Sequence, residues 1–199
     1  MKNSITERFI MSIPYNQLML ELKQKVSNAG LLRKAPTRGA IEILIVFSAF
    51  LITLFLVGEI NPFLNALMMI LVMIRSTYVA HDLIHNQYFS KHTDRQFSYF
   101  FGNFVLGLSA NWWRYAHNLL HHIYTNVRSK DEDIKAVGGV FVGKRDWGSL
   151  FHNNQKYLYW LLLPFLSLSC LYQTLWFSIK HKRWIELLIV FAHFLIPLY

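Results

Sequence analysis

The sequence contains very little cysteine and few charged side chains. Cys170 is the only cysteine in 199 residues and lies within an apolar run, which excludes an internal disulfide framework and a cysteine metal site. Charged residues make up 16% of the chain and hydrophobic residues 54%, too apolar a balance for a typical soluble domain. The first 40 residues lack the apolar core of a secretory signal, so we expect membrane insertion through internal segments.

Acidic residues are also scarce. The chain has 11 of them against 20 lysines and arginines, which gives a formal net charge of +9. The basic residues stand beside apolar segments and do not form a patch interleaved with aromatic side chains, so membrane topology explains them better than nucleic acid binding. We therefore expect a bilayer as the partner and no nucleic acid.

Long apolar runs predict an all-α integral membrane protein with about four transmembrane helices. Each run is long enough to cross a hydrocarbon core about 30 Å thick, or to begin such a crossing. The four runs are residues 41–58, 63–80, 157–179 and 184–199. Before them, residues 14–29 show helical amphipathic spacing and are expected at the membrane surface. We divide the chain into a cytoplasmic N-terminal region, 1–40, and a membrane domain, 41–199.

The positions of basic residues predict the orientation. Arg33, Lys34 and Arg38 precede the first run, which puts the N-terminus in the cytoplasm. Residues 97–113 are apolar but interrupted by glycine and asparagine, and we interpret them as re-entrant or interfacial. Residues 123–155 are polar and read as a cytoplasmic connection. The basic turn 180–183 opposes this scheme, because it would lie on the outer side.

Two short histidine blocks follow apolar segments and predict a metal site on the cytoplasmic face. The blocks contain His81 and His85, then His117, His121 and His122. Residues i and i+4 share a helix face, so each i, i+4 pair can converge on an ion. In an α-helix His122 would lie about 140° around from His117, which suits a second ion better. Several imidazoles beside a bilayer indicate a functional site, here a dinuclear one.

The pattern says less about the roles of the other histidines and about which metal is bound. His193 lies in an apolar run, as a satisfied core residue or an accessory ligand, whereas His92, His152 and His181 stand in polar surroundings. Neutral imidazole binds iron, copper and zinc, so the spacing alone leaves the metal open.

The motifs resemble those of the membrane-bound fatty acid desaturases. The first reads His-Asp-x-x-His from His81, and the second runs from Trp113 through His122 and is followed by Tyr124-Thr125-Asn126. This block is most similar to bacterial and cyanobacterial acyl-lipid desaturases, including the Δ6 front-end type, and the resemblance covers nearly the whole chain. A third histidine box of that family is missing, so the chain looks like the N-terminal portion of a longer enzyme, and 199 residues alone are expected to be inactive.

The resemblance implies an oxidoreductase that introduces a double bond into an acyl chain. It implies two iron ions, O2, a fatty acyl lipid or acyl-CoA substrate, and a separate electron donor such as ferredoxin or cytochrome b5. It also implies an integral membrane protein with its histidine boxes in the cytoplasm, in a bacterial inner membrane. No catalytic residue is expected beyond the metal ligands. Carboxylates close to the boxes can orient imidazoles through the second ring N–H. The candidates are Asp82, Asp131, Glu132 and Asp133.

Two other functions fit the same motifs. One is a related histidine-box hydroxylase or ketolase that acts on a hydrophobic substrate. The other is a non-catalytic membrane protein that uses the fold for metal binding or transport.

Overall fold

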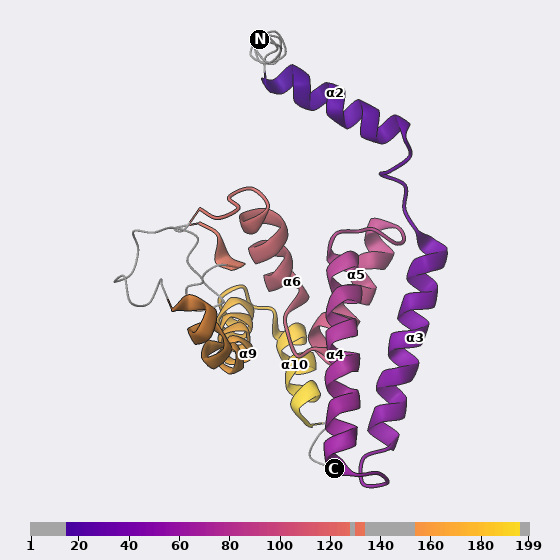
Figure 1. Ribbon diagram of the computed structural model, residues 1–199, viewed down its shortest axis with the longest axis vertical. Helices are drawn as coiled ribbons and strands as arrows, with labels where there is room; N and C mark the ends of the chain where they lie inside the picture. The colour runs from indigo at the N-terminus through magenta and orange to yellow at the C-terminus, as the bar shows by residue number, and fades with distance from the viewer. Residues whose placement is uncertain (1–14, 128–129, 134–153, 196–199) are drawn as a thin grey trace. The chain divides into compact units, whose positions relative to one another are not determined.

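The computed structural model describes residues 15–127, 130–133 and 154–195, and the part of the chain it describes is helical without strands (Figure 1). The predicted all-α class is therefore confirmed. Most of residues 123–155, expected as a cytoplasmic connection, lie outside these ranges, as do His152 and the end of the last apolar run. The chain divides into two compact units, residues 1–34 and 35–199, which we describe separately.

The first unit contains the expected amphipathic helix, α2 (Tyr15–Asn28). Gly30 ends it with a φ of +71°, a conformation that glycine adopts without a steric penalty. The amides of Gly30 and Leu31 bond to the carbonyls of Ser27 and Val26, as they do where a left-handed residue closes a helix.

In the second unit, α3 (Pro36–Phe55) and α4 (Pro62–Ile84) form an antiparallel hairpin (Figure 1). A proline begins each helix, where its missing N–H costs no hydrogen bond. The Asn61 side chain caps α4 by accepting from the amides of Phe63 and Leu64. Within the described residues, these two helices are long and apolar enough to cross a membrane, and they correspond to the first two predicted spans.

The segment predicted to be re-entrant is broken into shorter helices. The chain runs through α5 (Lys91–Tyr99) and the π-helix η1 (Phe100–Val105), turns at Gly107, and continues in α6 (Ala110–Trp113). Gly107 has a φ of +67°. Asn103 Oδ1 accepts from the Ala110 amide at 2.7 Å, which ties the outgoing and returning limbs together. No single helix passes through residues 97–113.

The last two helices, α9 (Gln155–Lys180) and α10 (Trp184–Leu195), form at the predicted third and fourth runs. In Figure 1, α9 is seen end-on whereas α3 and α4 are seen lengthwise, so α9 runs across their direction. Glu186, in the first turn of α10, bonds to Ser109 and Asn111. The basic turn before α10 therefore lies beside the segment that leads into the second histidine block. The predicted scheme, which puts this turn on the outer side, does not anticipate that contact.

The hydrophobic core of the second unit lies where α3, α4 and η1 meet. Phe50, Leu83 and Phe101 are almost completely buried there, together with Tyr88. This core fixes the end of α4, and with it the first histidine block.

Candidate metal centre

The first histidine block lies at the C-terminal end of α4. His81 is in the last turn and His85 is the residue that caps the helix, with its amide bonded to the His81 carbonyl. The i, i+4 spacing places the two rings on one face with centroids 4.5 Å apart, as the sequence predicts.

The second block lies on a π-helix, η2 (Arg114–His121). The His122 amide bonds to the His117 carbonyl, the i to i+5 pattern of this wider helix. An α-helix, which the spacing predicts, would put His122 about 140° away from His117. The wider turn removes that separation, and the rings of His117 and His122 lie 4.8 Å apart. Single-turn π segments are frequent at functional sites.

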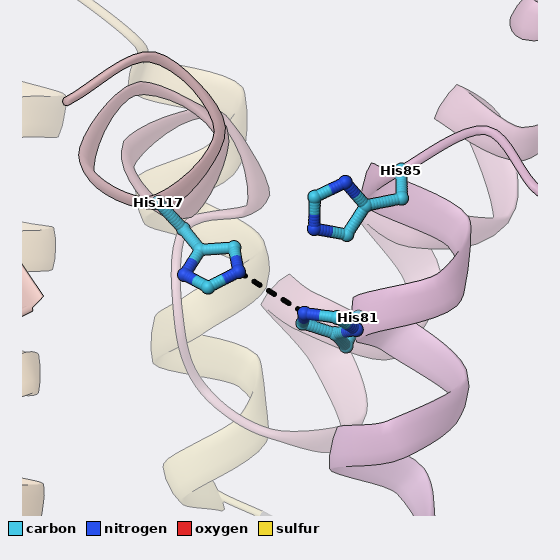
Figure 2. Close-up of side chains that lie close together, drawn as sticks. All are labelled: His81, His85 and His117. Carbon is cyan, nitrogen blue, oxygen red and sulfur yellow. Dashed lines mark hydrogen bonds between the residues drawn. The ribbon is translucent and has the colours of Figure 1, made fainter. Parts of the chain in front are cut away.

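The two blocks face each other. His81 Nε2 lies 3.0 Å from His117 Nε2, and Figure 2 shows both rings turned toward the space that His85 also faces. His122 Nε2 lies 3.3 Å from His85 Nε2. His121 stacks on His117 with centroids 5.1 Å apart. The structure thus brings together all five of the histidines that the sequence selects.

Two carboxylates contact histidines of the second block at their Nδ1 atoms. Asp133 Oδ2 lies 2.5 Å from His117 Nδ1, and Asp131 holds His121 Nδ1 at 3.0 and 3.1 Å. Asp131 is completely buried and also accepts from the Asn126 amide. A carboxylate on Nδ1 keeps the ring proton there and leaves Nε2 with a lone pair. Both imidazoles therefore present an unprotonated Nε2, and that of His117 faces His81.

Asp82 stands beside the first block, and a residue that the sequence analysis missed holds it in place. Its Oδ1 lies 3.7 Å from His81 Nδ1, and its Oδ2 accepts from the Tyr88 hydroxyl at 2.7 Å. The Tyr88 ring packs so closely on Gly39 that a Cβ there would lie 2.4 Å from it. Tyr88 is an aromatic residue in a loop, and no spacing rule marks it.

Asn118 is a second missed residue, although it lies inside the motif. Its Nδ2 donates to the Ile84 carbonyl at 2.7 Å, which joins the second block directly to the end of α4. Glu132 is half-buried, and its predicted role stays a prediction.

The electrostatic surroundings favour neutral imidazole in the first block. Burial, with the nearby positive charge that His81 and His117 would carry, lowers the pKa of His85 to about 4. At pH 7 this ring is neutral, which is the form that binds a metal ion.

His193 is placed apart from the cluster. Its Nδ1 donates to the Phe104 carbonyl at 2.9 Å, and its ring lies against Gly107. It is half-buried and lines the cavity described next, and its two expected roles stay predictions.

An apolar cavity of about 730 Å³ borders the cluster. Its walls include Leu106, Trp112 and Leu171, with His193 at one side. Asp133 and Trp113 also line it, and Trp113 lies 6.2 Å from the His81 ring. The cavity therefore reaches the residues that contact the histidines.

The donor set fits a metal centre. His81, His85 and His117 each offer a nitrogen within 4.8 Å of the others, and His117, His121 and Asp133 form a second such group. Two nitrogens that each lie about 2.1 Å from one ion are roughly 3 Å apart at a right angle. The 3.0 Å between His81 and His117 matches that spacing. Imidazoles suit iron, copper or zinc.

Comparison with known proteins gives one family match and several curated relatives. The family described as "Fatty acid desaturase" matches residues 59–199. A Delta(5) fatty acid desaturase of Caenorhabditis elegans is 27% identical over 83% of this chain and 39% of its own length. An sn-1 linoleoyl-lipid 6-desaturase of a Synechocystis strain is 37% identical over 44% of this chain and 25% of its own.

A Delta 8-(E)-sphingolipid desaturase of Candida albicans is 29% identical over 84% of this chain and 30% of its own length. The chain thus spans between a quarter and two fifths of the length of these three relatives. No solved structure gives a significant match.

Proposed function

The chain belongs to the fatty acid desaturase family, and we propose that it carries the metal centre and acyl site of an oxidoreductase that introduces a double bond into a fatty acyl chain. One observation supports this most directly: an apolar cavity is lined by Asp133, which contacts His117, and by Trp113, whose ring lies 6.2 Å from that of His81. A saturated alkyl chain has no polar group to hold it, so an apolar enclosure beside a metal-binding cluster is what the reaction requires.

We propose that the cluster holds two iron ions through His81, His85, His117, His121 and His122. The bound metal would supply the dioxygen activation that no amino-acid side chain can provide. Around it, Asp133 and Asp131 hold the protons of His117 and His121 on Nδ1, so that Nε2 of each ring stays a ligand. Asp82, anchored by Tyr88, stands in the corresponding place for His81.

The apolar cavity would bind the acyl chain and exclude water from it. Leu106, Leu108 and Leu171 provide walls without hydrogen-bonding groups, so the chain is held by burial of its methylene groups. Asp133 contacts His117 and also lines the cavity, so an acyl chain bound there would have its reacting carbons near the cluster.

We further propose that the membrane domain covers residues 41–199 and that the cytoplasmic region covers 1–40. In this arrangement α3 and α4 cross a bacterial inner membrane and present the cluster to the cytoplasm, in line with Arg33, Lys34 and Arg38 before α3. The count of four spans stays a prediction, because it depends on whether α9 and α10 both cross.

The substrate is expected to be a fatty acyl lipid or acyl-CoA, and the electrons are expected from a separate carrier, ferredoxin or cytochrome b5. The curated names of relatives include lipid and sphingolipid desaturases, which supports the membrane-lipid alternative.

The test is expression of the whole coding sequence that contains this chain, in cells whose fatty acids are known. New unsaturated fatty acids in the lipid fraction, lost in a His121→Ala variant, would support the desaturase. New hydroxy or keto products would indicate the related oxygenases. Bound metal without any new product would indicate a metal-binding membrane protein.

A further inference from the structure

A second pocket lies apart from the histidine cluster, between α5, η1 and the start of α10. It has a volume of about 460 Å³. Its polar wall consists of Gln96, Tyr99, Asn103, Lys182, Arg183 and Glu186. None of these residues belongs to the histidine cluster or to the cavity beside it.

The basic groups of this pocket come from the turn that precedes α10. Lys182 and Arg183 are exposed, and the N-terminus of α10 begins immediately after them. The first amides of a helix point their N–H groups outward and carry partial positive charge. The one acidic side chain of the lining, Glu186, accepts from the Ser109 hydroxyl at 2.5 Å and from the Asn111 amide group, and because both donors are neutral it keeps its charge. Two basic side chains against this one carboxylate leave the lining with one net positive charge, which favours an anion.

A buried side chain provides an unused donor in the same wall. Asn103 is completely buried, and its Oδ1 accepts from the Ala110 amide. Its Nδ2 has no hydrogen-bond acceptor in the described part of the chain. Buried amide donors are normally paired, and leaving one unpaired destabilises the folded protein. Because this donor is itself closed to solvent, pairing it with a ligand oxygen in the pocket requires a rotation of the Asn103 side chain.

Next to this pocket lies an apolar groove of about 320 Å³, lined by Tyr99, Phe100, Phe104 and Ile189. Tyr99 and Ile189 also line the polar pocket, so the two spaces adjoin. A polar, cationic space joined to an apolar groove matches a ligand with an anionic head and a hydrocarbon tail. This second feature distinguishes a lipid from a free anion.

We propose that this site binds an anionic membrane phospholipid. Its phosphate lies near Lys182, Arg183 and Asn103 Nδ2, and one acyl tail lies along the groove beside Phe100 and Phe104. Because Glu186 joins α10 to Ser109 and Asn111, the bound lipid also stabilises the segment that leads into the second histidine block.

The experiment measures binding of phosphatidylglycerol to the purified protein in detergent, by native mass spectrometry and thermal unfolding. Phosphatidylcholine is the zwitterionic comparison and inorganic phosphate the free-anion comparison. The test variant is K182Q/R183Q, and the control is K91Q/K156Q, which removes the same charge from two exposed lysines elsewhere. Asn103→Asp keeps the acceptor for Ala110 and replaces the free donor with a negative charge.

We expect phosphatidylglycerol to raise the unfolding temperature more than phosphatidylcholine does. Each basic residue contributes about 1 kcal/mol near anionic lipid, so K182Q/R183Q should weaken binding roughly tenfold or more. Asn103→Asp should weaken it as well, and K91Q/K156Q should not. Equal binding by the test and control double variants would overturn the site. An equal effect of inorganic phosphate would overturn the lipid assignment. Neither result depends on desaturase activity.

Discussion

The Nε2 atoms of His81 and His117 lie 3.0 Å apart, although 36 positions separate the residues in the chain. One ring comes from the end of a long α-helix and the other from a short π-helix that returns to it. Two facing lone-pair nitrogens at this distance repel each other unless a proton or a cation lies between them. Either a hydrogen bond or a shared ion therefore joins the two rings, and the proposed metal centre requires the ion.

His117→Ala is expected to remove most of the bound metal and all desaturation. His117 contacts His81 and also belongs to both three-residue ligand groups, so its loss opens both. Metal content of the purified protein and fatty-acid profiles measure the two effects. His92→Ala, at an exposed position on α5, is the matched control. Full metal content in His117→Ala would contradict the shared centre.

Asp133→Asn and Asp131→Asn should each lower metal affinity by about 10–100-fold, with folding retained. The amide no longer holds the ring proton on Nδ1 as firmly, so His117 and His121 become poorer ligands. Competition with a chelator measures the change. Glu59→Gln, an exposed carboxylate in the turn between α3 and α4, should leave the affinity unchanged. If all three variants behave alike, the carboxylates do not act through the imidazoles.

Gly39→Ala is expected to destabilise the protein by about 1–3 kcal/mol, because the new Cβ would lie 2.4 Å from the Tyr88 ring. Displacement of Tyr88 also releases Asp82. The unfolding temperature reports the first effect and metal affinity the second. Gly58→Ala is the comparison, where no atom lies within 4 Å but a φ of +84° makes any side chain strained. Only Gly39→Ala should reduce metal affinity.

Cys170→Trp should abolish desaturation and leave the metal in place. Cys170 lines the apolar cavity, and an indole would fill space that the acyl chain needs. Leu161→Trp, on an exposed face of the same helix, should have no effect. Loss of metal together with activity in Cys170→Trp would show that the substitution disturbs the cluster and does not act on the cavity.

Single cysteines at positions 91 and 130 should be labelled from the same side of the membrane. The two positions flank the histidine blocks, which share one cluster. Labelling from opposite sides would contradict that cluster. A third cysteine at position 182 tests whether α9 crosses the membrane. Four spans require position 182 to be labelled from the side opposite to positions 91 and 130. Labelling from the same side as those positions would show that α9 does not cross. A Cys170→Ser background avoids labelling of the native thiol.

Local sequence determined the parts of this protein that depend on composition and short spacing. Apolar length predicted α3 and α4, and the i, i+4 rule predicted the pairing of His81 with His85. The same spacing within each block selected the five histidines. These features depend on residues within one or two helical turns of each other, so a linear pattern is sufficient to find them. The four candidate carboxylates were chosen only for their closeness to the boxes, and Asp131 and Asp133 contact histidines 10 and 16 positions away.

Only the tertiary structure decided how these parts meet. The π-helical turn moved His122 toward His117 and His85, because the i to i+5 bond changes the angle that an α-helix would give. Tyr88 and Asn118 gained their roles through contacts with Asp82 and Ile84, which no spacing rule describes. The contact of Glu186 with Ser109 joins residues 77 positions apart. Such pairings depend on packing between distant segments, and the local sequence carries no periodic signal for them.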